Sequence, residues 1–252
     1  MKPPPTIGRY RLLDELGSGG EALVLRAVDT STQEEVALRL ALAAATFTAP
    51  KEWPEVHPGW VRWLDWGTDP QHGPWQVFEL LGGKTLRQSV QSSGPLAWPE
   101  WRSFVHQSLE AVKALHVARW VHGDLNGDNF VLAGAEWKLL ELPFLRFDPP
   151  PGRTALFGSI HTLSPEQLNG VKADAASDFF ALGCLYYFAA CGEFPHAGSS
   201  SREIAINRLR FPAEPLAEKA PHLPASWSGW VMNLLALAPK DRSPTMPADE
   251  TT

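Results

Sequence analysis

Residues 121–132, Val-His-Gly-Asp-Leu-Asn-Gly-Asp-Asn-Phe-Val-Leu, form a polar segment with apolar ends near the middle of the 252-residue chain. Residues 99–118 precede it and carry apolar side chains at nearly helical spacing, which predicts a helix. Residues 137–140 follow it as Trp-Lys-Leu-Leu, which has the composition of a strand. We therefore expect residues 121–132 to lead from a helix toward a strand.

The predicted elements change in kind along the chain. Strand-like stretches fill the first third, at residues 10–16, 22–28, 36–40 and 75–80. Asp29–Glu35 between two of them is predicted to be a hairpin turn. From Gly82 onward the pattern is helical, with further helices predicted over 177–190 and 226–237. The sequence therefore predicts a β-rich first part, a helical second part and a hinge near Gly82.

Composition excludes several classes of protein. The chain is 44% hydrophobic with a net charge of −6, which argues against a disordered protein. Its 28 acidic residues outnumber 22 basic ones, which disfavours binding to nucleic acid through phosphate neutralisation. Two cysteines are too few for a disulfide-rich scaffold. A folded domain with a large buried core is the class that remains.

The sequence also predicts a cytoplasmic protein without a membrane span. The longest apolar run, Phe179–Cys191, has 13 residues, whereas a helix that crosses a bilayer needs about 20. Met1–Pro5 lead into polar residues and lack the apolar core of a signal peptide. Cys184 and Cys191 would lie about 10 Å apart along a helix, too far for a disulfide. Two reduced thiols are therefore expected, as is usual in the cytosol.

A glycine-rich stretch lies between the first two predicted strands. Residues 16–24 are Leu-Gly-Ser-Gly-Gly-Glu-Ala-Leu-Val, and such glycines let backbone amides approach an anion closely. Taken alone the stretch is weak evidence for a phosphate site, because a glycine-rich hairpin is more often only a turn.

Further motifs follow it in order. They are Val36-Ala37-Leu38-Arg39, Glu79-Leu80-Leu81-Gly82, residues 121–132, Ser164-Pro165-Glu166, Ser177–Gly183 and Pro239-Lys240-Asp241-Arg242. Their order and spacing resemble the protein kinase family, specifically bacterial-type Ser/Thr kinases, over roughly residues 8–244. The resemblance implies an α+β, two-lobed protein kinase-like fold. A small antiparallel β N-lobe over 1–81 and a larger α-helical C-lobe over 82–252 would together form one domain.

The resemblance also implies ATP as the phosphate donor and Mg²⁺ beside it. Asp124 would accept the proton of the substrate hydroxyl, and Asn129 would hold a metal. Gly17 and Gly19 would approach the phosphates. The alternative, that residues 121–132 only support the lobe, stays open.

The same resemblance assigns the adenine site. Val24, Ala37 and Val131 match residues that sandwich the base, while Glu79 and Leu81 match the hinge that bonds its edge, with Phe78 as gatekeeper. These positions either bind nucleotide without rapid turnover or are plain core packing, since they would be apolar either way.

Several charges depart from the family pattern. Arg39 replaces the strand lysine, so a planar fork stands where a compact ammonium belongs. Gly123 replaces the arginine that reads activation-loop phosphate, and Asn126 replaces the loop lysine. Glu141-Leu142-Pro143 stands where the family has Asp-Phe-Gly. Because Mg²⁺ demands near-ideal geometry, a carboxylate displaced by one methylene weakens the case for a metal at Asn129 and Glu141.

The regulatory helix of the family is predicted to be missing or vestigial. Only 17 residues, Leu40–Val56, separate Arg39 from His57-Pro58, and Pro50 and Pro54 would interrupt a helix there. Five tryptophans crowd the neighbouring stretch, at positions 53, 60, 63, 66 and 75. They are interpreted as core packing, as a filling of the vacated groove, or as an exposed docking patch for a partner.

Retained scaffold beside altered charges suggests a pseudokinase. Glu166 and Arg242 match a family ion pair, and Asp178 matches the aspartate that holds the catalytic loop. The leading hypothesis is therefore a regulatory or scaffolding module in signalling, with a protein partner and weak or no phosphotransfer.

Two alternatives remain at this stage. One is an atypical active Ser/Thr kinase, a transferase that uses Asp124, Asn129 and Glu141. The other is a small-molecule phosphotransferase, because residues 122–126 also resemble the aminoglycoside and choline type. The Ser-Pro-Glu motif argues against the latter, since that family lacks such an activation segment.

Overall fold

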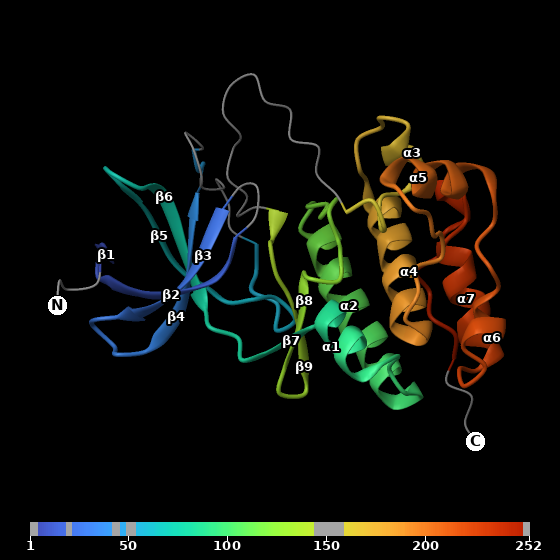
Figure 1. Ribbon diagram of the computed structural model, residues 1–252, viewed down its shortest axis with the longest axis horizontal. Coiled ribbons are helices and arrows are strands. Elements are labelled where there is room, and N and C mark those ends of the chain that lie inside the picture. The colour runs from blue at the N-terminus through green and yellow to red at the C-terminus, as the bar shows by residue number, and fades with distance from the viewer. Residues whose placement is uncertain (1–4, 19–21, 42–45, 49–53, 144–158, 249–252) are drawn as a thin grey trace. The chain divides into compact units, whose positions relative to one another are not determined.

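The computed structural model of this chain describes residues 5–18, 22–41, 46–48, 54–143 and 159–248 (Figure 1). Two compact units divide the chain. The first comprises Met1–Gly82 and Glu141–Leu156, and the second comprises Gly83–Leu140 and Phe157–Thr252. The expected change from a β-rich first part to a helical second part is confirmed by the order of the elements.

The first unit is built on a curled antiparallel sheet (Figure 1). Its strands are β1 (Thr6–Ile7), β2 (Tyr10–Ser18), β3 (Ala22–Asp29), β4 (Glu35–Ala41), β5 (Trp63–Asp69) and β6 (Gly73–Glu79). They lie in the order β1-β2-β3-β4-β6-β5. The four strands predicted from the sequence are confirmed as β2, β3, β4 and β6.

The two faces of this sheet differ. Successive side chains on a strand point to opposite faces, and one set is apolar and packs into a core. That core contains Ile7, Tyr10, Leu12, Ala27, Val36, Leu38, Leu40, Trp75 and Val77. Val24 on β3 and Ala37 and Arg39 on β4 have the opposite parity and therefore lie on the other face.

The N-terminal strand corrects one expectation. From the sequence alone, residues 1–6 are expected to be a loose chain end, but Thr6 pairs with Arg11 in the β1–β2 hairpin. The reason is tertiary: Ile7 is fully buried, and the Arg9 guanidinium bonds Asp29 at 2.8 Å and Asp65 at 3.0 Å. Residues 1–4 lie outside the described part of the chain.

No described residue between Ala41 and Trp63 is helical, in agreement with the predicted loss of the regulatory helix. Residues 42–45 and 49–53 of this stretch, including Trp53, lie outside the described residues. Trp60 and Trp75 are buried and Trp63 is partly buried, whereas Trp66 is 43% exposed and contacts Phe47. Most of the described tryptophan rings are thus packed, which favours core packing or groove filling over an exposed patch.

The second unit combines a three-stranded sheet with helices. The strands are β7 (Gly83–Thr85), β8 (Phe130–Ala133) and β9 (Glu136–Leu139). The helices are α1 (Leu86–Ser93), α2 (Trp98–Val117), α3 (Pro165–Leu168), α4 (Ala175–Cys191), α5 (Ser201–Arg210), α6 (Leu216–Lys219), α7 (Ala225–Leu234) and the short 3₁₀ helix η2 (Pro239–Asp241). The helices predicted over 99–118 and 177–190 are confirmed as α2 and α4.

The last predicted helix is shorter than expected. It was predicted over 226–237, but α7 ends at Leu234. The carbonyls of Ala236 and Leu237 accept hydrogen bonds from Arg242 at 2.9 and 3.1 Å, so the chain leaves the helix there. Pro239 further disfavours helical geometry in the residue before it.

Helix α4 is the central element of the second unit (Figure 1). Asp174 and Ser177 form a capping box at its start, and Gly192 ends it with a left-handed φ of 80°. Cys184 is buried and Cys191 is partly buried, and both are free thiols. None of the described helices is long and apolar enough to cross a lipid bilayer.

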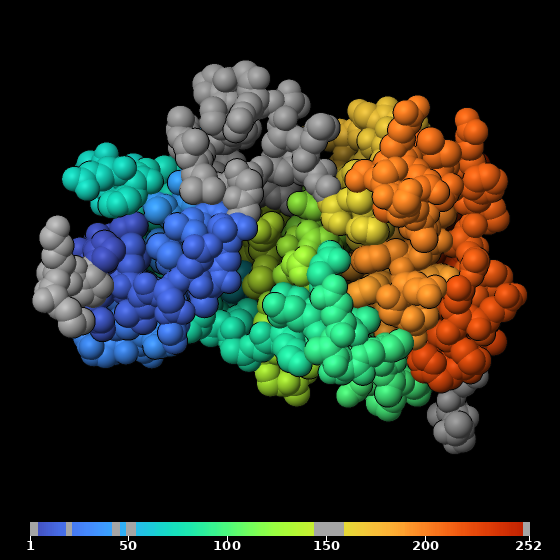
Figure 2. All heavy atoms as spheres, in the orientation of Figure 1, coloured from blue at the N-terminus to red at the C-terminus, as the bar shows by residue number. Residues whose placement is uncertain are grey.

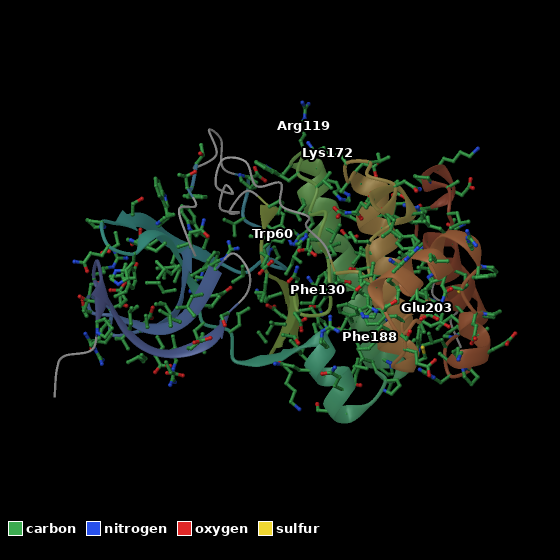
Figure 3. All side chains as sticks on the ribbon, turned by 45° about the horizontal axis from the view of Figure 1, so that its top comes forward. Trp60, Arg119, Phe130, Lys172, Phe188 and Glu203 are labelled. Carbon is green, nitrogen blue, oxygen red and sulfur yellow. The ribbon has the colours of Figure 1, made fainter. Side chains whose placement is uncertain are left out.

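Aromatic side chains join α2, α4 and α7. Trp101 is fully buried, donates from its indole nitrogen to the Tyr186 carbonyl at 2.8 Å, and meets Trp227 edge-on. Phe104 of α2 packs at 5.4 Å from Phe130, which Figure 3 labels inside this unit. This interior fixes the framework on which the segment 121–132 is held.

Candidate active site

Asp178 of α4 anchors the segment 121–132. The buried Asp178 carboxylate accepts hydrogen bonds from the backbone amides of His122 at 2.8 Å and Gly123 at 2.7 Å. His116 of α2 contacts the same carboxylate at 2.8 Å. The prediction that Asp178 holds this backbone is confirmed, and it explains how a loop keeps a defined geometry.

Asp124 and Asn129 are brought together by this loop. The Asn129 side-chain amide donates to the Asp124 carbonyl at 2.8 Å, and Asn129 is 4% exposed. The Asp124 carboxylate accepts the Ser159 backbone amide at 3.3 Å. Asp124 therefore has a fixed backbone and a partly exposed carboxylate, an arrangement that could accept a proton from a hydroxyl. Gly158, which precedes Ser159, lies outside the described residues.

Two loop positions lack the cations expected from the resemblance. Gly123 adopts a φ of 72°, and its carbonyl accepts a hydrogen bond from Gln167 of α3 at 2.9 Å. Asn126 places its carboxamide 3.5 Å from an Asp124 carboxylate oxygen and accepts the Asp128 amide at 2.9 Å. The loop thus keeps its local hydrogen bonds while these two positions carry no charge. His122 is fully buried, and its ring lies 3.3 Å from the Leu140 carbonyl oxygen.

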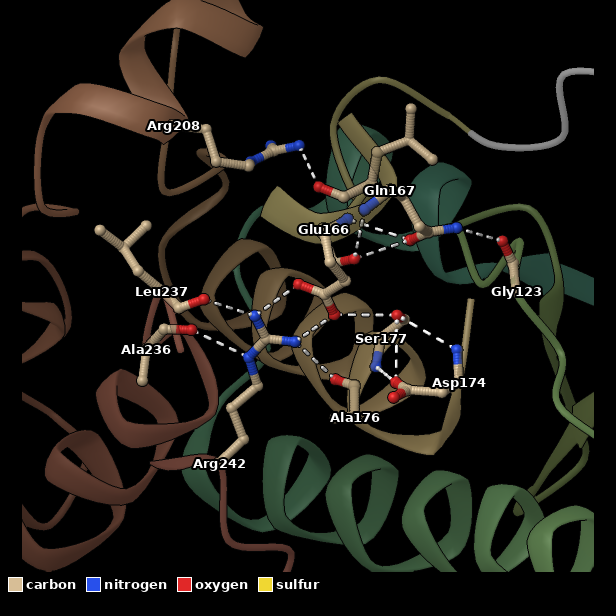
Figure 4. Close-up of polar contacts among 12 residues, drawn as sticks. Gly123, Glu166, Gln167, Asp174, Ala176, Ser177, Arg208, Ala236, Leu237 and Arg242 are labelled. Atoms are coloured by element: carbon tan, nitrogen blue, oxygen red, sulfur yellow. Dashed lines mark hydrogen bonds and ion pairs between the residues drawn. The ribbon is translucent and has the colours of Figure 1, made fainter. Parts of the chain in front are cut away.

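The predicted ion pair between Glu166 and Arg242 is confirmed (Figure 4). The guanidinium bonds both carboxylate oxygens, at 2.6 and 2.8 Å, and Ser177 donates to the same carboxylate at 2.8 Å. Further acceptors of this guanidinium are the carbonyls of Ala176, Ala236 and Leu237. A buried pair of this kind is compatible with folding because nearly every donor has an acceptor.

This network perturbs the ionisation of Glu166. Burial alone would raise its pKa, but hydrogen bonds from Arg242, from its own backbone amide and from Ser177 lower the pKa from 4.5 to about 2. Glu166 is therefore ionised in the folded domain at neutral pH. Its role is to stabilise the fold rather than to transfer a proton.

The nucleotide candidates of the first unit share one face of its sheet. Val24 lies directly across from Arg39, and Ala37 lies across from Phe78. Val24 and Ala37 are partly exposed, whereas Arg39 and Phe78 are each 9% exposed. An apolar, partly open surface of this kind fits a planar base.

Arg39 is tied to its own sheet. Its guanidinium lies 3.4 Å from the side-chain oxygen of Gln76, the buried residue opposite it on β6. The structure thus makes the strand cation a cross-strand partner of a buried amide. The Arg39 side chain is buried, with 9% of its surface exposed.

The remaining candidates of the first unit lie at its strand ends. Glu79 ends β6, and its carboxylate accepts the Arg62 amide at 2.7 Å, while Leu81 follows it and is partly exposed. Gly17 lies near the end of β2 with open space where a Cβ would be, as close approach of a ligand requires. Gly19 lies outside the described residues.

The metal candidates fit unequally. The Asn129 side-chain oxygen has no hydrogen-bond partner among the described residues, and an amide oxygen suits Mg²⁺. Glu141 is exposed and adopts a left-handed φ of 51°, which is strained for a residue with a side chain. No cluster of three or more His, Cys, Asp or Glu side chains suited to a metal occurs among the described residues.

Comparison with known proteins agrees with this geometry. The family model of the protein kinase domain matches residues 10–248. The chain belongs to the protein kinase family. The curled sheet of the first unit and the helices of the second are those of a two-lobed protein kinase fold.

The curated relatives are bacterial Ser/Thr kinases. The kinase domain is 30% identical to a probable serine/threonine-protein kinase PkwA of Thermomonospora curvata, over 85% of this chain and 30% of that protein. It is 28% identical to the serine/threonine-protein kinase PknB of Mycobacterium leprae, over 96% of this chain and 42% of that protein. The kinase domain thus spans less than half the length of these relatives.

Three polar residues of this kinase domain were missed by sequence reasoning. Gln76 holds Arg39, Gln167 holds Gly123, and Arg208 of α5 donates to three carbonyls of residues 160–163. Only Gln76 carried a signal in the sequence, as a polar residue in the apolar run Trp75–Leu80. The partners of Gln167 and Arg208 lie 44 or more residues away and required the tertiary structure.

Proposed function

We propose that this kinase domain is a pseudokinase, a regulatory or scaffolding module in signalling with weak or no phosphotransfer. The observation that carries the proposal is Asn126. It stands where the family has the loop lysine, and its carboxamide lies beside the Asp124 carboxylate without bringing a positive charge. A missing cation about 4 Å from phosphate forfeits roughly 4 kcal/mol at an effective dielectric near 20. Each increase of about 1.4 kcal/mol in the activation free energy lowers the rate of phosphotransfer tenfold.

Two further positions support the same conclusion. Arg39 carries a guanidinium where the family has an ammonium, and this guanidinium is engaged by Gln76. Glu141 is one methylene longer than the family aspartate and has a left-handed backbone. In the family, the strand lysine pairs with a glutamate on the regulatory helix. No described residue between Ala41 and Trp63 forms such a helix.

Nucleotide binding is part of the proposal. The kinase family implies ATP, typically with Mg²⁺. The partly exposed Val24 and Ala37 would contact the adenine, and Glu79 and Leu81 would bond its edge. Val131, which the resemblance also assigns to the adenine, lies on β8 of the second unit and is buried. Asn129 would offer its free amide oxygen to a metal. ATP, when bound, would supply the phosphoryl group, and we propose that it binds with little dependence on metal.

A specific observation favours the alternative of an active Ser/Thr kinase. Asp178, Asp124 and Asn129 form the hydrogen-bonded loop that a proton acceptor and a metal ligand need. By contrast, the third alternative, a small-molecule phosphotransferase, is disfavoured by the Glu166–Arg242 network, which ties down a segment that the aminoglycoside and choline type lacks.

Thermal unfolding with ATP tests nucleotide binding. We expect ATP to raise the melting temperature by the same small amount with Mg²⁺, with Mn²⁺ and with a chelator. Ala37→Trp should remove the shift by filling the proposed adenine surface. A shift that requires metal would contradict the metal-independent part of the proposal, and no shift at any ATP concentration would contradict nucleotide binding.

Phosphate incorporation from radiolabelled ATP tests the pseudokinase. We expect wild type to match the Asp124→Asn variant on itself and on a general protein substrate. The variant Arg39→Lys/Asn126→Lys/Glu141→Asp restores the family residues at these three positions and should incorporate more phosphate than wild type. Incorporation by wild type that Asp124→Asn abolishes would instead identify an active kinase.

A further inference from the structure

Helix α5 has one buried and one exposed face. Ile204 and Arg208 are buried. The opposite face carries Arg202, Ile206, Leu209 and Arg210, which recur at i, i+4, i+7 and i+8 and therefore form one stripe. Phe211 continues it past the helix end. We call Arg202, Ile206, Leu209, Arg210 and Phe211 the α5 seam. Part of this helix lies at the visible surface of the second unit (Figure 2).

The buried face holds the helix rigidly. The Arg208 guanidinium is fully buried and donates to the carbonyls of Ile160 at 2.7 Å, His161 at 2.8 Å and Leu163 at 2.6 Å. Figure 4 shows this side chain reaching away from α5 toward the segment beside α3. Hydrogen bonds from a charged group are among the stronger polar contacts. They hold α5, and therefore the α5 seam, in a fixed position.

The exposed face of α5 carries several large apolar side chains. Ile206 and Leu209 are each 38% exposed and Phe211 is 57% exposed. Single exposed apolar side chains are normal, but these three lie within six residues of one another on the seam. Ile204, on the other face, shows that α5 already contributes its share to the core.

The charges of the seam are positive and uncompensated. Neither Arg202 nor Arg210 forms an ion pair with any described residue. The acidic residue of the helix, Glu203 (labelled in Figure 3), is engaged, because its carboxylate accepts the Ser199 amide at 2.8 Å and hydroxyl at 2.6 Å. The seam therefore presents two cations beside three apolar side chains.

We infer, on the basis of the regulatory function proposed above, that the α5 seam docks an acidic amphipathic segment of a partner protein. Apolar side chains of that segment would cover Ile206, Leu209 and Phe211, and its carboxylates would pair with Arg202 and Arg210. A second copy of this chain is a poorer occupant, because a symmetric contact through the seam sets arginine against arginine. A lipid surface is also a poorer one, since two cations and three apolar residues give little membrane affinity.

The test uses a synthetic helical peptide with leucines along one face and glutamates beside them. A matched peptide has lysines in place of the glutamates. We expect fluorescence anisotropy of labelled peptide to report binding of the glutamate peptide to the whole chain, with at least about tenfold weaker binding of the lysine peptide. Ile206→Ser/Leu209→Ser and, separately, Arg202→Glu/Arg210→Glu should each weaken binding about tenfold. Only the second pair should abolish the salt dependence.

Matched controls use exposed residues elsewhere in the second unit. Val171→Ser/Arg119→Glu changes one exposed apolar and one exposed cationic side chain (Arg119 extends away from the helices in Figure 3). This variant should bind like wild type. Circular dichroism melts of all variants should superimpose, because only surface side chains change.

Several outcomes would overturn the inference: equal binding of both peptides, equal weakening by the control variant, or no measurable binding. Sedimentation that shows a dimer lost only in the seam variants would assign the seam to a second copy instead. Binding to phosphatidylserine vesicles lost in the same variants would assign it to membranes. None of these measurements involves phosphate transfer, so a failure here is distinguishable from a failure of the pseudokinase proposal.

Discussion

Two polar regions of this kinase domain differ in how their charges are satisfied. Around Glu166 and Arg242 the buried guanidinium meets both carboxylate oxygens and three carbonyls. At residues 39, 126 and 141, which the resemblance assigns to phosphate and metal contacts, the side chains differ from the family pattern, and Asn126 lacks the family's positive charge. The difference teaches that the first set of charges acts on the chain itself. In the proposed function the second set would act on a bound nucleotide, although Arg39 and Asn126 also form hydrogen bonds within the chain.

Arg242→Met should have the largest effect on stability. It leaves the carboxylate of Glu166 without its guanidinium and removes the donor for three carbonyls, so we expect a loss of about 3–5 kcal/mol in the free energy of unfolding. Urea denaturation measures this loss. Lys172→Met, an exposed lysine of the same unit, should change it by less than about 0.5 kcal/mol. Equal losses in the two variants would break the comparison.

Asp178→Asn should have the next largest effect. An amide has one acceptor oxygen for two backbone donors, and hydrogen bonds to charged groups contribute roughly 1.5–3 kcal/mol each. We expect a loss of that order and faster hydrogen exchange at the amides of His122 and Gly123. Asp174→Asn, at the N-cap of the same helix, should cost little, because asparagine caps as well as aspartate. Unchanged exchange at both amides would remove Asp178 from its anchoring role.

The pH dependence of stability should follow Glu166. Its folded pKa lies below its ordinary value, so its contribution is complete above about pH 4.5 and is lost as pH falls toward about pH 2. Thermal melts across this window should show wild type losing stability more steeply than Glu166→Gln, which has no carboxylate to protonate. Parallel curves for the two proteins would mean that this ion pair does not control acid stability.

Asn126→Lys should have the smallest effect on folding. The variant loses the hydrogen bonds of the carboxamide to Asp124 and to the Asp128 amide, which contribute about 0.5–1.5 kcal/mol each. Urea denaturation that gave a loss as large as that of Arg242→Met would show that Asn126 is a structural residue. The two regions would then not differ in kind.

Local patterns in the sequence were sufficient for much of the fold. Strand-like apolar runs predicted β3 and β4. Helical spacing of Phe104, Leu109 and Leu115 predicted α2, because side-chain periodicity follows directly from helix geometry. Short elements such as β1 and α5 were missed. Few residues carry their pattern, and contacts distant in sequence stabilise them, as Arg208 does for α5.

Residue identity alone determined which family residues this kinase domain keeps, Asp124 and Asn129, and which positions it alters, Arg39, Asn126 and Glu141. Only the tertiary structure decided what each side chain does, because hydrogen bonds depend on distances between residues far apart in the chain. It turned Arg39 toward Gln76, joined Glu166 to Arg242 across 76 positions, and left the α5 seam uncovered.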